Sequence, residues 1–195
     1  ADVIREAFYI ANEGRPGPVL IDIPKDVSNQ LTDYEYKAPR EIIRKSEDIT
    51  EEGVDLAIQM IKEAKKPYIF AGGGVTLSDA KDEAVRFAEL CDAPVTCSLM
   101  AMGGFPGEHE LYTGMIGMHG TKASNIGVQK CDLLIAVGAR FSDRVTGNTD
   151  KFARGAKVIH IDVDPAEINK NVAVDHFIIG DVKEVHVWVG KGWGG

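Results

Sequence analysis

Two arginines and a carboxylate follow an apolar run in the second half of the chain, and together they predict a site for an anionic ligand. The run covers residues 133–137 and is followed by Gly138 and then by the polar residues Arg140, Ser142, Asp143 and Arg144. Such a run is typical of a strand buried on both faces of a parallel sheet. Ligands bind beyond the carboxyl ends of these strands, where loops and helix N-termini form a crevice. A solvated loop with a surface ion pair is an equal alternative for this stretch alone.

A glycine run is the second candidate for chemistry. Gly72, Gly73 and Gly74 follow a predicted strand at residues 68–71. The order strand, glycine run and helix lets backbone N–H groups approach the phosphates of a nucleotide. The dinucleotide fingerprint G-x-G-x-x-G is incomplete, however, because Leu77 stands at its third glycine. A tight strand-to-helix turn is therefore an equal interpretation.

Residues after other predicted strands add apolar and acidic groups. Met100 and Met102 follow residues 94–98, where flexible methionines either wrap an apolar ring or join the core. His119 lies in a predicted loop, where a lone histidine is usually structural, but its glycine neighbours permit close approach to a ligand. Asp162 stands near the end of a predicted strand, where an acidic residue can bind ribose hydroxyls.

Alternating strands and helices must position these residues. Apolar runs predict five strands, at residues 68–71, 94–98, 133–137, 157–163 and 177–179. Periodicity and capping residues predict helices that start at Thr50, at Ser78, near residue 122, at Asp164 and after Gly180. This order predicts an α/β fold, with a doubly wound, Rossmann-like, mostly parallel sheet.

The first 49 residues have a different pattern. An apolar stripe begins at Val3 without an upstream cap and stops at Gly14, which can take the left-handed C′ conformation. Residues 19–23 predict a buried strand. A single αβ unit cannot bury its own apolar faces, so we expect the end of a preceding domain and a chain that is a fragment. Residues 31–49 are the expected linker, and residues 188–195 are an unassigned tail.

Composition narrows the classes of function. A formal net charge of −8 argues against nucleic-acid and anionic-membrane binding. No apolar run approaches the roughly 20 residues of a membrane span, so a soluble, cytoplasmic protein is expected. Cys91, Cys97 and Cys131 lack metal-ligand spacing, which favours buried free thiols and no metal site in this chain.

Six stretches, in order, resemble the acetolactate synthase family of thiamine diphosphate enzymes. They are EGRPGPVLIDIPKDV, IFAGGGV, GMIGMHG, GARFSDRVTG, HIDVDPAEINKN and GDV. The resemblance implies three domains, of which residues 1–30 would be the end of the N-terminal pyrimidine-binding domain and residues 50–187 the central FAD-binding domain. It also implies a reaction that condenses two 2-oxo acids, pyruvate with pyruvate or 2-oxobutyrate. That reaction involves no net oxidation, so the implied role of FAD is structural.

The resemblance carries site residues with it. The implied FAD-binding positions are Arg15, Gly72, Gly73, Gly74, Leu99, Met100, Gly117, Met118, His119, Gly138, Ala139, Arg140, Asp143, Arg144, Val145, Asp162, Val163, Asp181 and Val182. The positions that correspond to the substrate channel are Lys25, Met118, Asp143 and Arg144. Ser142 departs from the family, where a second acidic residue is common, which leaves the charge of that loop less certain.

The resemblance also sets expectations for the rest of the enzyme. Thiamine diphosphate and Mg²⁺ would be bound by domains absent from this chain, so the chain alone is expected to be inactive. A homo-oligomer with a small regulatory subunit is the expected assembly. The alternatives are the central domain of another thiamine diphosphate enzyme, of the glyoxylate carboligase or pyruvate oxidase type, and a non-catalytic dinucleotide-binding module.

Overall fold

The chain forms two compact units, residues 1–45 and 46–195, in a computed structural model that describes residues 1–33, 35–39 and 49–193. Part of the expected linker, residues 34 and 40–48, lies outside the described residues, as do residues 194–195 of the expected tail.

The first unit contains two helices, α1 (Asp2–Asn12) and α2 (Lys25–Ser28). Helix α1 ends where it was predicted to end. Gly14 follows the C-cap residue and has the positive φ, +58°, of the predicted left-handed conformation. The predicted buried strand at residues 19–23 is wrong. These residues are irregular and exposed, and the side chain of Leu20 is 91% exposed. A strand needs a partner for its backbone groups and an apolar layer for its side chains, and the described part of this unit supplies neither.

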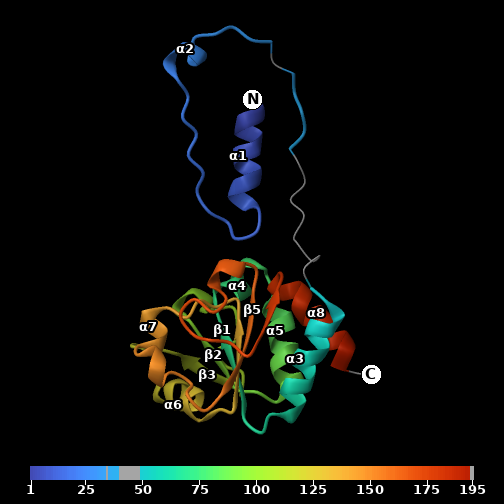
Figure 1. The fold of residues 1–195 in the computed structure, drawn as a ribbon, viewed down its shortest axis with the longest axis vertical. Coiled ribbons are helices and arrows are strands. Elements are labelled where there is room, and N and C mark those ends of the chain that lie inside the picture. The colour runs from blue at the N-terminus through green and yellow to red at the C-terminus, as the bar shows by residue number, and fades with distance from the viewer. Residues whose placement is uncertain (34, 40–48, 194–195) are drawn as a thin grey trace. The chain divides into compact units, whose positions relative to one another are not determined.

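The second unit is built on a six-stranded parallel sheet in the order β3-β2-β1-β4-β5-β6 (Figure 1). Its strands are β1 (Pro67–Ala71), β2 (Val95–Cys97), β3 (Tyr112–Met115), β4 (Leu133–Val137), β5 (Lys157–Asp162) and β6 (His176–Ile179). Every strand pair is parallel. The chain order reverses between β1 and β4, so the doubly wound α/β fold is confirmed and its switch point lies there.

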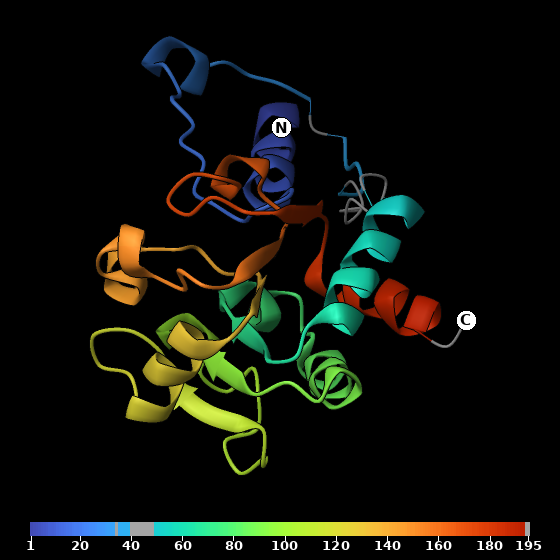
Figure 2. The same cartoon turned by 60° about the horizontal axis from the view of Figure 1, so that its bottom comes forward.

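Helices cover both faces of the sheet (Figures 1 and 2). The longer helices are α3 (Glu51–Glu63), α5 (Lys81–Cys91), α6 (Lys122–Lys130) and α8 (Val182–Trp193). The shorter ones are α4 (Gly73–Leu77), α7 (Asp143–Thr146) and the 3₁₀ turns η1 (Leu99–Ala101), η2 (Thr149–Lys151) and η3 (Pro165–Glu167). Helices α3, α4, α5 and α8 pack against one face, and α6 with the segment around Phe141 and Phe152 packs against the other.

Side chains of the central strands alternate between two cores. In β1, Ile69 belongs to the core under α3, α5 and α8, whereas Phe70 belongs to the core under α6. In β4, Ile135 and Leu134 divide in the same way, and both are fully buried. Both faces of these strands are therefore apolar, which explains why they appear in the sequence as continuous apolar runs.

Strand β3, which precedes the loop of His119, is not among the five predicted strands. All four of its residues are only half-buried, and it lies at one edge of the sheet. Gly114 has a φ of +100°, and the pairing register with β2 shifts between Val95 and Thr96. An irregular edge strand of this kind lacks the apolar run by which a buried strand is recognised.

Three helix boundaries differ from the prediction. Ser78 does not cap the N-terminus of α5; it is the C-cap of α4, and its hydroxyl donates to Asp181 Oδ2 at 2.8 Å. Asp164 caps only the single 3₁₀ turn η3. Helix α8 runs through Trp193, so residues 188–193 are helical instead of an unassigned tail.

Candidate ligand site at the carboxyl edge of the sheet

The predicted site residues of the second unit gather along one edge of the sheet. We call this the carboxyl edge and define it as residues 72–74, 99–102, 116–120, 138–147 and 162–163. These segments begin at or just beyond the ends of β1, β2, β3, β4 and β5. Because all the strands are parallel, their carboxyl ends lie at the same edge. Gly72, Leu99, Met118, Gly138 and Asp162 therefore share one edge of the sheet.

The glycine run makes a close contact with the loop after β4. The amide of Gly72 donates to the carbonyl of Val137 at 2.8 Å, and the amide of Gly74 donates to the carbonyl of Gly138 at 2.9 Å. A Cβ on Gly72 would lie 2.1 Å from the Gly138 oxygen. Glycine is thus required here because two backbones approach each other at the switch point. Two of the three glycine amides thus donate to backbone carbonyls of the protein. Fewer amides of the run remain to bind a phosphate than the sequence suggested.

The loop after β4 alternates between the core and solvent. Ala139 and Phe141 are buried against the face that α6 covers, whereas Arg140 is exposed. The short helix α7 then carries Asp143 and Arg144 into solvent, with 85% and 77% of their side chains exposed. Their charged atoms are 3.9 Å apart, a weak contact at such exposure. Both guanidinium groups are accordingly presented to solvent at the carboxyl edge.

The carboxyl edge also carries exposed apolar side chains. Leu99 and Met100 on η1 and Met118 after β3 have 71%, 74% and 68% of their surfaces exposed. Grouped exposed apolar side chains mark binding surfaces more often than isolated ones do. The carboxyl edge therefore combines apolar and cationic groups, which suits a ligand with a flat ring and an anionic linker.

Asp162 and Asp181, which were predicted to contact the ligand, accept hydrogen bonds within the fold. Asp162 is buried, and its Oδ1 accepts the amide of Asp164 at 2.9 Å. Asp181 is also buried, and it accepts from Ser78 and from the amide of Lys183. Each carboxylate thus orders the turn that follows its strand. Beside them, Val182 lies in the core, whereas Val163 and Val145 are half-buried.

His160 supports the site, although it was not predicted from the sequence. It is fully buried on β5, and its Nε2 lies 2.9 Å from the carbonyl oxygen of Ala139, to which it donates. Its ring meets Phe141 edge-on, and its Nε2 is 3.7 Å from Asp162. The histidine therefore links the loop after β4 to the end of β5. A polar residue inside the apolar run of β5 was the available signal, since buried polar groups generally have a specific partner.

Arg15 and Lys25 belong to the first unit, where both are exposed. The structure describes that unit by itself, so it does not test the predicted roles of these two residues. Gly117 and His119 do lie on it, the first half-buried and the second exposed.

The cysteines and acidic groups offer no second chemical site among the described residues. Burial raises the pKa of Cys91 and Cys131 to about 12 and that of Cys97 to about 11, so all three thiols stay neutral and unreactive near pH 7. They are free, as predicted. Within the described ranges no three His, Cys, Asp or Glu side chains are grouped to hold a metal ion. No helix in the same ranges is long and apolar enough to cross a membrane.

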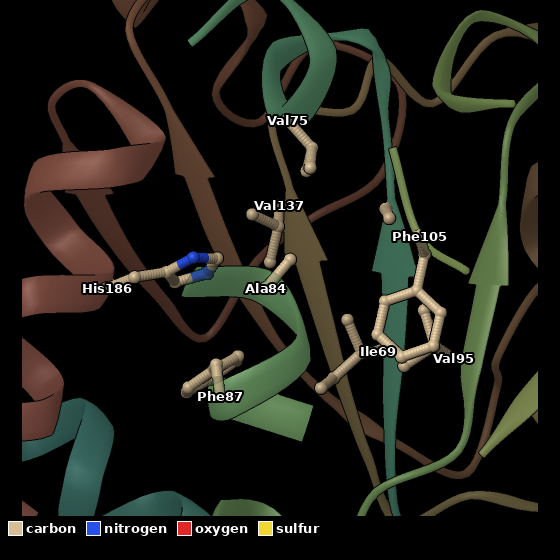
Figure 3. A pocket seen from close by; sticks show the side chains of 9 residues that line it. Ile69, Val75, Ala84, Phe87, Val95, Phe105, Val137 and His186 are labelled. Atoms are coloured by element: carbon tan, nitrogen blue, oxygen red, sulfur yellow. The ribbon is translucent and has the colours of Figure 1, made fainter. Parts of the chain in front are cut away.

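A small cavity lies between the sheet and the helices of one face. It is bounded by apolar side chains of the sheet, α4 and α5, and by His186 of α8 (Figure 3). Its volume of about 10 Å³ is close to the least that holds one water molecule. An organic ligand cannot enter it, so the carboxyl edge remains the candidate site.

Comparison with known proteins identifies the family. The profile described as "Thiamine pyrophosphate enzyme, central domain" matches residues 54–187, which is more than half of the chain. The chain belongs to the thiamine pyrophosphate enzyme family. The matched residues include the whole sheet and every segment of the carboxyl edge.

Similar sequences within the thiamine pyrophosphate enzymes agree with the resemblance seen in the motifs. Over 94% of the chain it is 50% identical to a probable acetolactate synthase large subunit of Methanocaldococcus jannaschii. Over 93% it is 48% identical to the acetolactate synthase large subunit of Corynebacterium glutamicum. The chain covers 32% and 29% of those proteins, so it spans about a third of the length of the curated relatives it matches.

A solved structure with the same fold is that of a benzoylformate decarboxylase. Benzoylformate decarboxylase from Polynucleobacter necessarius aligns with a TM-score of 0.74 over 97% of this chain and 35% of its own. The two sequences are 20% identical, so this likeness shows the fold alone.

Proposed function

We propose that this chain is the central part of an acetolactate synthase large subunit, which condenses pyruvate with pyruvate or 2-oxobutyrate. The observation that carries the proposal is the 50% identity to such a large subunit over 94% of the chain. In this assignment residues 1–30 end the pyrimidine-binding domain, residues 31–49 link the domains and residues 50–187 form the FAD-binding domain. The proposed location is the cytoplasm, and the proposed assembly is a homo-oligomer with a small regulatory subunit.

We also propose that the carboxyl edge binds FAD, and its side chains fit that cofactor. Leu99, Met100 and Met118 expose apolar surface on which an isoalloxazine ring can pack. Arg140 and Arg144 expose guanidinium groups that suit a pyrophosphate. FAD would act as a structural cofactor because the condensation involves no net oxidation.

The described residues would then bind and orient, and residues outside this chain would perform the condensation. Thiamine diphosphate, held with Mg²⁺ by other domains, supplies the thiazolium chemistry. Asp143 and Arg144, an exposed pair of opposite charge, would line the channel through which the 2-oxo acid enters. Arg144 would attract the substrate carboxylate, and Asp143 would limit the excess of positive charge. Met118 would form an apolar wall of the same channel, and Lys25 would add a cation from the first unit.

The test is acetolactate formation from pyruvate with FAD, thiamine diphosphate and Mg²⁺. The full-length protein should form acetolactate, and residues 1–195 alone should not, because thiamine diphosphate and Mg²⁺ would be bound by other domains. A full-length protein that bound thiamine diphosphate but formed a different product from pyruvate would favour another enzyme of the family. Turnover by residues 1–195 alone would show that the active site has been misplaced.

A further inference from the structure

Two loops of the carboxyl edge meet through their backbones. The amide of Met118, after β3, donates to the carbonyl of Arg144, in the first turn of α7, at 3.1 Å. Gly117 makes the approach possible, because a Cβ at that position would lie 2.4 Å from the same carbonyl oxygen. The spacing between the Met118 and Arg144 side chains therefore depends on where the backbone of residues 117–118 is held.

Asn125 of α6 holds that backbone at two points. Its Oδ1 accepts the amide of Gly117 and its Nδ2 donates to the carbonyl of Gly117, both at 3.1 Å. An asparagine amide has one acceptor and two donor hydrogens, so it matches both backbone groups of a single residue. The helix that carries Asn125 is itself fixed, because Thr121 caps it and accepts the amide of Asn125 through its carbonyl.

The other described contacts of this loop are backbone hydrogen bonds and the buried side chain of Ile116. Gly117 has a φ of +101°, a region that glycine enters freely and leaves as freely. Met118 and His119 are exposed, so their side chains add no packing that would anchor the turn. Within the loop, the amide of Gly120 donates to the carbonyl of Gly117 at 2.9 Å, so that carbonyl is a shared fixed point for the turn and for Asn125.

We propose that Asn125 is a positioning residue. It fixes the spacing of the Met118 and Arg144 side chains at the carboxyl edge without touching the ligand. The proposal rests on the proposed function, in which both side chains contact FAD. Asn125 itself is half-buried beneath the loop, on the side of α6. Its role requires a donor and an acceptor together, so Asp, which keeps only acceptors near neutral pH, should fail almost as fully as Leu.

The experiment measures FAD dissociation constants of the full-length protein by quenching of flavin fluorescence, with the flavin absorption spectrum recorded for each bound form. Asn125→Asp and Asn125→Leu are compared with Gln129→Leu, a change at an exposed position of the same helix. Both Asn125 variants should raise the constant about tenfold and shift the flavin bands, whereas Gln129→Leu should do neither. Unchanged affinity and spectra in the Asn125 variants would overturn the proposal.

A double-mutant cycle separates positioning from a general loss of structure. If Asn125 acts through Arg144, the effect of Asn125→Asp on FAD affinity should be clearly smaller in an Arg144→Ala background. The same fold-change in both backgrounds would show that Asn125 does not act through the Arg144 side chain, and the proposal would fail.

A ligand-free measurement distinguishes failure of this inference from failure of the proposed function. If the wild-type protein binds no FAD, the proposed function is wrong, and amide hydrogen exchange at Met118 then decides the inference. Exchange there should be faster in Asn125→Asp than in Gln129→Leu, because the Met118 amide loses its fixed partner on Arg144. Equal exchange in the two variants would overturn the positioning role.

Discussion

The amide nitrogen of Gly74 lies 2.9 Å from the carbonyl oxygen of Gly138, and this hydrogen bond joins the loops after β1 and β4 at the switch point of the sheet. A Cβ on Gly138 would lie 2.6 Å from the Cα of Gly74, where neither backbone can yield. The residue also has a φ of +56°. Gly138→Ala should therefore lower the free energy of unfolding by at least about 3 kcal/mol, measured by denaturant unfolding.

Gly147 provides the matched control for that substitution. Its φ is +58°, but nothing lies within 4 Å of the position that a Cβ would take. With ψ at −118° the residue lies outside the left-handed helical region, and Gly147→Ala should cost only the backbone strain, about 1 to 3 kcal/mol, without the added clash. Equal losses for the two alanine variants would show that the close approach of the two loops has no energetic weight.

Arg144→Ala should weaken FAD binding by the full-length protein. Losing a guanidinium partner of an anionic ligand typically costs about 1.5 to 3 kcal/mol. Arg86, exposed on α5, is the charge-matched control, and Arg86→Ala should leave flavin content after purification unchanged. If both variants retained FAD with unaltered kinetics, the charges around α7 would be those of a solvated loop.

Asp132 should make the free energy of unfolding fall at low pH. Although partial burial opposes the effect, the amides of Lys65 and Lys66, which donate to its carboxylate at 2.8 and 2.9 Å, hold the pKa of Asp132 below its usual value. A lowered pKa means that the stabilisation is present above the unfolded-state pKa and is lost as the pH falls through the folded-state pKa. Asp132→Asn should cost about 1 kcal/mol at pH 7, and thermal unfolding should show the two proteins converging in acid.

His186 should make the protein less stable in moderate acid. Burial lowers its pKa from 6.5 to about 4, it stacks on Phe87, and neither ring nitrogen has a hydrogen-bond partner among the described residues. The unfolded chain therefore binds the proton first, and stability falls as the pH drops from 6.5 through about 4, by roughly 3 kcal/mol in total.

His186→Leu should remove that acid sensitivity and raise the stability at pH 7 by about 1 kcal/mol, because it removes buried polar atoms without partners. Unfolding free energies of both proteins between pH 4 and pH 8 are the measurement. A constant difference across that range would contradict a buried, neutral His186.

The doubly wound sheet was predictable because its central strands are buried on both faces. β1, β4 and β5 are apolar runs followed by a glycine or an acidic residue, and the parallel order then places those residues at one edge. The edge strand β3 was missed because its half-buried side chains and Gly114 give no periodic pattern. The supposed strand at residues 19–23 failed for the opposite reason, since an apolar run alone supplies no pairing partner.

The supporting contacts of the site depend on distant partners, and no local pattern encodes these. The motif suggested that Gly72 and Gly74 approach a ligand, whereas the structure shows them against Gly138. Asn125 lies four residues after a helix cap and resembles any polar residue of a first turn. Only the folded chain shows that it contacts Gly117.

Amide hydrogen exchange of the full-length protein with and without FAD tests the central claim most directly. FAD should slow exchange in residues 99–102, 117–120 and 138–145, because these segments form the carboxyl edge. Exchange at Lys65 and Lys66, at the opposite ends of the strands, should not change. Protection at those two lysines without protection at the carboxyl edge, or no protection of this domain by bound FAD, would contradict the account.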